Sequence, residues 1–327
     1  MEEKNYNEIS NLFFDDCEKQ IEKTVKTKRI CLLVSLISFV AVFGVCFAAG
    51  SINSDIFWYI VLIPIIACFV GFVLRKRAKE KLKLELKQLE NRFFDEVYMQ
   101  IVADKLNARI NSKSTINASF KKENANVGDV IKARDVEIAG FYNGCPYKIS
   151  TGTETVVESI LYHNSTKTVV SYEPKTIDRE LMCNYSIKRK IDSSISISSP
   201  MARGTLIGMI CGPENRVKMD NKKFHFEVGC DNPVTAYKFL TADVMESIMA
   251  FDKIARIDGM LISDQDMTVL SPNMFVDLKY SPKFSKNMKK NRERYSGNSV
   301  LPTATAAANK ITEYLSYTPA ALISYHE

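Results

Sequence analysis

The sequence predicts an α+β fold in which a transmembrane helical hairpin precedes a domain with a mainly antiparallel sheet and a few helices. Three observations lead to this prediction. Two long uncharged apolar runs lie in the first quarter of the 327-residue chain, its positive charge excess is confined to their flanks, and short alternating patterns follow residue 128. Strands in series, interrupted by few helices, favour an α+β fold with an antiparallel sheet.

The two apolar runs cover residues 30–50 and 56–74 and are separated by five residues, 51–55. A helix of about 20 apolar residues is long enough to cross the hydrocarbon core of a bilayer. The short connector leaves room only for an antiparallel turn. We therefore predict a two-helix transmembrane hairpin over residues 30–74.

The net charge of +6 belongs entirely to the flanks of these runs. Residues 21–90 contain eleven Lys and Arg against five Asp and Glu, and the rest of the chain balances at 33 against 33. Basic residues near the ends of a span stay on the cytoplasmic side. This predicts a multi-pass protein of a bacterial plasma (inner) membrane with both termini cytoplasmic. It gives no support for a nucleic-acid partner.

Helical periodicity continues on both sides of the runs. We expect a cytoplasmic N-terminal helix over 1–29 and an amphipathic helix over 75–110, which could pack as a short antiparallel coiled coil. Small residues four apart, Gly44 and Ala48 in the first run and Ala67 and Gly71 in the second, allow close helix approach. Packing of the two helices on each other is the favoured use, with a homo-oligomer as the alternative.

A polar linker is expected over 111–128 and a soluble α+β domain over 129–327. Asn143-Gly144, between residues 136–142 and 145–151, is a strong hairpin signal. Thr241 is the expected N-cap of a helix that continues to Phe251. A further helix is expected over 303–317.

Residues 226–246 resemble the signature of a bacterial membrane-anchored family of uncharacterised proteins, domain of unknown function thirty-one thirty-seven. The positions that carry the resemblance are Phe226, Asp231, Ala236, Tyr237, Leu240, Thr241, Met245 and Glu246. The resemblance implies an N-terminal two-span hairpin and a cytoplasmic α+β domain. It implies no activity and no catalytic residues.

A basic loop is expected over residues 280–298, and it is the most suggestive binding feature. Its six cations are Lys283, Lys286, Lys289, Lys290, Arg292 and Arg294. Each cation near an anionic bilayer contributes about 1 kcal/mol of attraction, so anionic lipid or a protein partner is a candidate ligand. A solvated surface loop is the simpler interpretation of the same pattern.

Motifs for catalysis, metal or cofactor binding are absent from the sequence. The eight cysteines form no C-x-x-C pair, and no phosphate loop or nucleophile motif occurs. We therefore expect no catalytic residues, no metal and no cofactor. An enzyme of unrecognised type would have to assemble its site from residues such as Asp231, His225 and Lys238.

These patterns predict a membrane-tethered binding or scaffolding module on the cytoplasmic face. Its partners would be the lipid bilayer and another protein. Tethering would raise the effective concentration of a weakly bound partner. An accessory or regulatory subunit of a membrane transport complex is the first alternative, and an unrecognised enzyme is the second.

Overall fold

The computed structural model describes residues 5–48, 54–117, 126–164, 167–178, 181–200, 216–272 and 280–317. These residues divide into two compact units. The helical unit comprises residues 1–97 and 281–299, and the sheet unit comprises residues 98–280 and 300–327.

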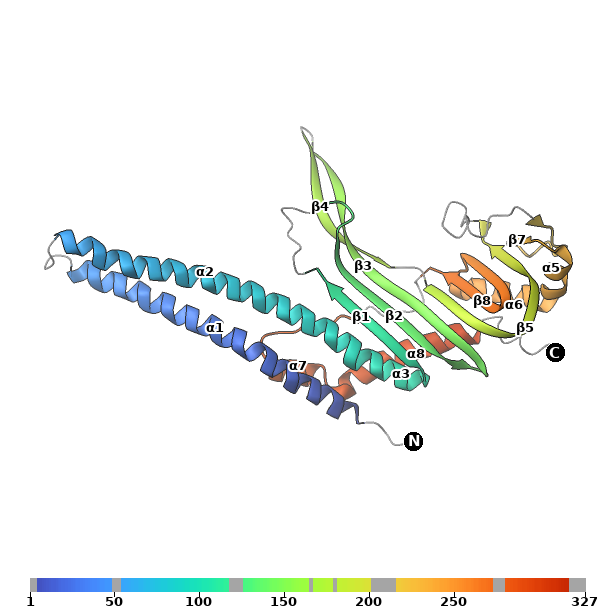
Figure 1. Ribbon diagram of the computed structural model, residues 1–327, viewed down its shortest axis with the longest axis horizontal. Coiled ribbons are helices and arrows are strands. Elements are labelled where there is room, and N and C mark those ends of the chain that lie inside the picture. Colours follow the sequence, from blue (N-terminus) through green and yellow to red (C-terminus); the bar gives the residue numbers. More distant parts are fainter. Residues whose placement is uncertain are drawn as a thin grey trace. The chain divides into compact units, whose positions relative to one another are not determined.

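The helical unit is built on a pair of long helices, α1 (Tyr6–Ala48) and α2 (Ser54–Phe93), which lie side by side and antiparallel (Figure 1). The two helices approach each other closely at Gly71, because a Cβ atom there would lie 2.5 Å from Ser35 Oγ. The predicted packing of the two helices through small residues is confirmed at Gly71, but it is wrong at Gly44, where an added Cβ atom would meet nothing within 4 Å. The helix α7 (Met288–Arg294) contacts α1.

The predicted transmembrane hairpin is wrong. In the part of the chain that the structure describes, no helix is both long enough and apolar enough to cross a bilayer. The same finding contradicts the predicted plasma-membrane location and the predicted multi-pass topology with two cytoplasmic termini. Residues 30–48 and 56–74 lie within α1 and α2, helices of 43 and 40 residues that also include charged segments.

Aromatic rings hold the charged halves of α1 and α2 together. Phe14 and Phe93 are fully buried, with ring centroids 5.7 Å apart. Phe284, which precedes α7, brings its ring within 5.5 Å of Phe14 and 5.6 Å of Phe93. Its backbone N–H donates a 2.6 Å hydrogen bond to Glu90 Oε1. The segment 281–299 is therefore part of the helical core, although almost 200 residues separate it from α2.

The sheet unit contains one antiparallel sheet. Its described strands are β1 (Arg109–Ile116), β2 (Val130–Tyr142), β3 (Cys145–Asn164), β4 (Lys167–Asp178), β5 (Leu181–Ser198), β6 (Arg216–Val217), β7 (Glu227–Cys230) and β8 (Gly259–Ser271). The strand order is β1-β2-β3-β5-β7-β6, with β4 also paired to β3 and β8 to β5. The α+β class with a mainly antiparallel sheet is confirmed.

Turn chemistry explains the most regular part of this sheet. Asn143 and Gly144 both have positive φ angles, 49° and 79°, as a two-residue hairpin turn between β2 and β3 requires. The expected linker over 111–128 differs from the structure, because residues up to Ile116 pair with β2 as strand β1. The composition of β1 is as polar as that of a linker. Only its pairing with β2 identifies it as a strand.

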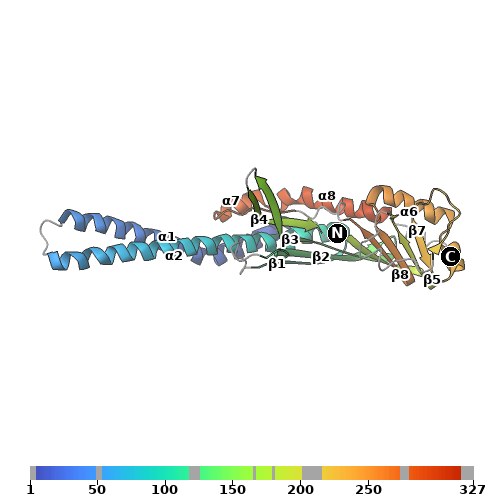
Figure 2. The ribbon, with the colours of Figure 1, turned by 90° about the horizontal axis from the view of Figure 1, so that it is seen from above.

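Helices accompany the sheet of this unit. These are α3 (Met99–Leu106), α5 (Pro233–Phe239), α6 (Ala242–Ala255) and α8 (Gly297–Ser316), and α3 follows the single-turn π-helix η2 (Phe94–Tyr98). Figure 2 shows α6 and the later part of α8 on the same side of the sheet, where the rings of Phe251 and Tyr314 meet at 5.1 Å. Thr241 caps α6 as expected, accepting a hydrogen bond from the N–H of Val244.

Candidate functional site: a basic groove and an exposed apolar surface

A groove of about 610 Å³ lies in the helical unit, between α1, α2 and the start of α7. We call it the basic groove, because it is lined by six cations and two carboxylates. Its charged residues are Glu18, Glu22, Lys26, Lys28, Arg29, Arg75, Lys286 and Lys289. Its remaining lining is Ile21, Val25, Leu32, Leu82, Asn287 and Met288.

The sequence places these cations far apart, and the helical pairing brings them together. Arg29 and Arg75 belong to the antiparallel helices α1 and α2, while Lys286 and Lys289 come from the segment at the start of α7. That segment is fixed by Asn291, whose side-chain oxygen accepts the N–H of Ser285 at 3.0 Å. The wall formed by residues 286–289 is therefore held in place by hydrogen bonds. The cations of the groove come from α1, α2 and this segment.

One carboxylate in the groove is already neutralised. Lys26 Nζ lies 2.7 Å from Glu22 Oε1, and the hydrogen bond from this ammonium group lowers the pKa of Glu22. Among the residues that the structure describes, the other five cations of the groove have no ion-pair partner within 4 Å. Six positive and two negative side chains leave a net charge of +4, which favours an anionic ligand.

The floor of the groove is apolar. Ile21, Leu82 and Met288 are all nearly inaccessible to solvent, with at most 5% of their surface exposed. Leu32, at the other end, is 41% exposed. The groove thus combines a cationic rim with an apolar base, as a site for an amphiphilic anion requires.

The hairpin exposes apolar side chains over a long stretch that begins at Ile30 on α1 and at Leu74 on α2. We call this stretch the apolar surface. Eight large side chains from each helix are between 41% and 70% exposed. They are Ile30, Leu32, Leu33, Val34, Leu36, Ile37, Phe39 and Val40 from α1, and Leu62, Ile63, Ile65, Ile66, Phe69, Val70, Phe72 and Leu74 from α2. Soluble monomers rarely expose a contiguous apolar patch larger than a few hundred Å².

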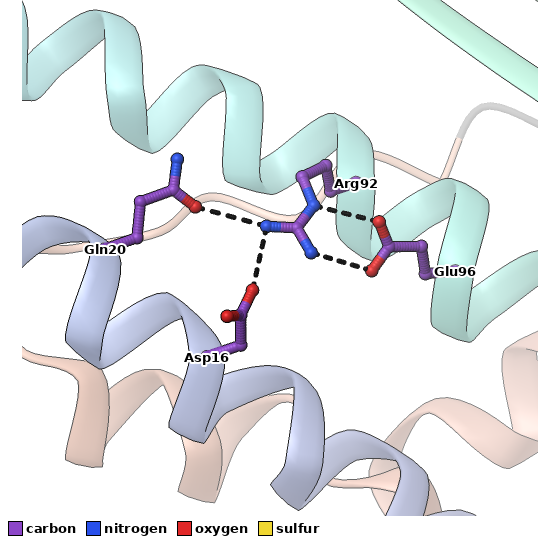
Figure 3. A network of polar contacts seen from close by, with 4 residues as sticks. All are labelled: Asp16, Gln20, Arg92 and Glu96. Atoms are coloured by element: carbon purple, nitrogen blue, oxygen red, sulfur yellow. Dashed lines mark hydrogen bonds and ion pairs between the residues drawn. The ribbon is translucent and has the colours of Figure 1, made fainter.

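A polar network of the helical unit is structural rather than ligand-binding. Arg92 donates to Asp16 and Gln20 of α1 at 3.1 Å each and to both carboxylate oxygens of Glu96 (Figure 3). The carboxylate of Glu96 is the largest of the causes that raise the pKa of Arg92. Because the guanidinium uses its donors within the protein, it has little capacity left for a ligand.

The predicted basic segment divides into two groups. Lys286 and Lys289 line the basic groove. Arg292 pairs with Asp15, Arg294 lies 5.5 Å from the ring centre of Tyr295, and the backbone N–H of Lys290 donates to the Asn287 cap. Lys283 contributes its backbone to hydrogen bonds with the Tyr295 hydroxyl. The expectation of a loop is wrong for residues 288–294, which form α7.

Sequence reasoning missed the groove cations on α1 and α2. Lys26, Lys28, Arg29 and Arg75 are visible in the sequence as flanks of the apolar runs. These cations lie near Lys286 and Lys289 only because α7 packs against α1. No local sequence pattern predicts that contact. The buried Phe284 was the available signal, since an isolated aromatic in a basic segment indicates packing.

The positions of the signature that resembles a known family have structural roles. Phe226, Ala236, Leu240 and Met245 are buried, Thr241 is the N-cap of α6, and the Tyr237 hydroxyl donates to the carbonyl of Lys218 at 3.1 Å. Asp231 and Glu246 are exposed.

The residues of the enzyme alternative, Asp231, His225 and Lys238, do not line the basic groove. His225 Nε2 lies 3.3 Å from Asp252 Oδ2, and its ring stacks on Phe226 at 4.4 Å. Lys238 is exposed on α5. The described residues contain no cluster of three or more His, Cys, Asp or Glu that could hold a metal.

A second, shallower pocket lies on the sheet unit. It has a volume of about 370 Å³ and is lined by Asn111, Lys113, Asp135, Val136, Glu137, Ser150, Thr151 and Met182. Glu137 is occupied by an ion pair with Lys148 at 2.8 Å. The mixed charges of this pocket favour no single class of ligand.

No family model, no curated protein and no solved structure matches this chain. The resemblance of residues 226–246 to the membrane-anchored family therefore stays a prediction. The basic groove and the apolar surface are the features of the described residues that bear on function.

Proposed function

We propose that this protein is a binding module that its helical hairpin attaches to a lipid surface. The observation that carries the proposal is the apolar surface, with its sixteen exposed large side chains on α1 and α2. Attachment needs contact with lipid and does not require a helix to cross a bilayer. The sheet unit would then be held near its partners, which raises their effective concentration.

The distribution of the apolar side chains favours lipid over a protein groove. Exposed apolar residues occupy consecutive positions such as Leu32, Leu33 and Val34, so they point around the helix rather than along one stripe. A protein groove covers one stripe of a helix, typically at spacings of three and four. A fluid lipid surface has no fixed groove, so it can adapt to apolar side chains at any of these positions.

Charge supports the same ligand. The apolar surface ends at Arg29 on α1 and at Arg75 on α2, since Ile30 and Leu74 are its last members. Cations at the boundary between apolar and charged segments attract anionic headgroups. A protein partner would not require cations at this boundary.

Flotation of the full-length chain with phospholipid vesicles tests the proposal. The protein is expected to float with the vesicles, and the double variant Ile37→Asp/Ile66→Asp is expected to lose most of this binding. Each isoleucine side chain that reaches an apolar phase contributes about 1.5–3 kcal/mol, so two substitutions predict a loss of at least about 100-fold.

Phe141→Asp is the matched control. Phe141 lies on β2 and is 75% exposed, so it is at least as accessible as Ile37 and Ile66. This variant is expected to float like the unaltered chain. Equal losses in the control and in the hairpin variant, or no flotation of the unaltered chain, would contradict lipid attachment.

A further inference from the structure

The basic groove lies at the boundary between the charged and the apolar halves of the hairpin. Arg29 and Arg75 line it and directly adjoin Ile30 and Leu74, the members of the apolar surface that are next to the charged halves. Leu32 belongs both to the groove and to the apolar surface. A ligand in the groove therefore has cations on one side and apolar side chains on the other.

We propose that the basic groove binds the phosphate headgroup of one anionic phospholipid, with an acyl chain lying along the apolar surface from Leu32. This inference rests on the proposed function and deepens it, because it assigns a specific site to a lipid. A general attraction between basic residues and anionic membranes needs no groove.

The cations of the groove match a phosphate group. A guanidinium presents parallel N–H donors that suit phosphate oxygens, and Arg29 and Arg75 supply two of these groups. Lys286 and Lys289 add ammonium groups from a third segment, and both side chains are exposed. The pair of Lys26 with Glu22 leaves five cations against Glu18 alone.

The size and floor of the groove match the rest of such a ligand. Small-molecule sites have volumes of about 300–1,000 Å³, and the groove has about 610 Å³. Its apolar floor of Ile21, Leu82 and Met288 would exclude water beneath the headgroup. A free inorganic anion would leave this apolar floor uncovered, and therefore the geometry favours the amphiphile.

The test compares two double variants with the same change of charge. Lys286→Gln/Lys289→Gln removes two cations from the groove. Lys283→Gln/Lys290→Gln removes two cations from the same segment that do not line the groove. Binding of each full-length protein is measured by flotation with phosphatidylcholine vesicles, with and without phosphatidic acid.

The groove variant is expected to lose its preference for phosphatidic acid by about 30-fold, the value for two cations near an anionic headgroup. The control variant is expected to keep the preference of the unaltered chain. All three proteins are expected to bind pure phosphatidylcholine vesicles alike, because the apolar surface is unchanged.

Other results would overturn the inference in distinct ways. Equal losses of the preference for phosphatidic acid in both variants would indicate general surface electrostatics. An unchanged preference in the groove variant would show that the groove does not bind the headgroup. Stabilisation of the unaltered chain by glycerol 3-phosphate alone, but not of the groove variant, assigns the groove to a soluble phosphate instead. Failure of every form to bind any vesicle contradicts the proposed function as well.

Discussion

Single glycines decide how closely segments of the helical unit approach each other. At Gly297, the first residue of α8, an added Cβ atom would overlap the backbone carbonyl of Tyr6 and lie 2.7 Å from the N–H nitrogen of Asn7. The N–H of Gly297 donates to Ser10 Oγ at 3.0 Å. Backbone atoms cannot move aside as a flexible side chain can, so this position requires glycine.

Gly297→Ala is therefore expected to destabilise the protein by about 1–3 kcal/mol, as overpacking does elsewhere. Gly44→Ala is the matched control, because an added Cβ atom at that helical position meets nothing within 4 Å. Urea unfolding followed by circular dichroism measures both. Equal stability of the two variants would contradict the tight contact between α8 and α1.

Burial at the residue scale also sets the chemistry of one thiol. Cys17 is fully buried in α1, and burial raises its pKa to about 12. The neutral thiol is the favoured form in the folded protein at neutral pH. Cys17 is thus a packing residue and not a nucleophile.

At the scale of elements, apolar packing contributes more than the polar network to the pairing of α1 and α2. Phe93 is fully buried and contacts the rings of Phe13, Phe14 and Phe284. The neighbouring Arg92 side chain is 37% exposed, and water therefore screens its ion pair with Asp16.

Phe93→Ala is expected to lower the free energy of unfolding by about 3–5 kcal/mol, because a cavity replaces a buried ring. Arg92→Gln is expected to cost less than about 1 kcal/mol, the range of exposed ion pairs. Chemical denaturation of both variants checks this order. A larger effect of Arg92→Gln would show that the network of Figure 3 dominates the pairing.

Elements with a strong local signal could be predicted from the sequence. The Asn143-Gly144 turn and the Thr241 cap have local causes, and the structure has both. The helix expected over residues 303–317 is present as α8, but it begins at Gly297 and ends at Ser316. Strand β1 was missed because its residues resemble a polar linker until they pair with β2. The basic groove could not be predicted, because it depends on the contact of α7 with α1.

For the whole molecule, the apolar runs were the most informative feature of the sequence and also the source of its main error. They predicted spans of a bilayer, whereas among the described residues no helix meets the requirement for crossing one. What the structure retains of this signal is an exposed apolar surface bordered by cations. The proposed attachment to lipid follows from that surface.

A tryptophan placed on the apolar surface gives the most direct test of this attachment. Phe69 of α2 is 70% exposed and belongs to that surface. The chain has one tryptophan, so the variant Trp58→Phe/Phe69→Trp carries its only tryptophan at that position. Vesicles with brominated acyl chains quench tryptophan fluorescence only on close contact with lipid. Quenching of this variant is predicted, together with none in the control Trp58→Phe/Phe141→Trp, whose tryptophan lies on β2. Unquenched fluorescence of Trp58→Phe/Phe69→Trp at saturating vesicle concentration would contradict lipid attachment by the hairpin.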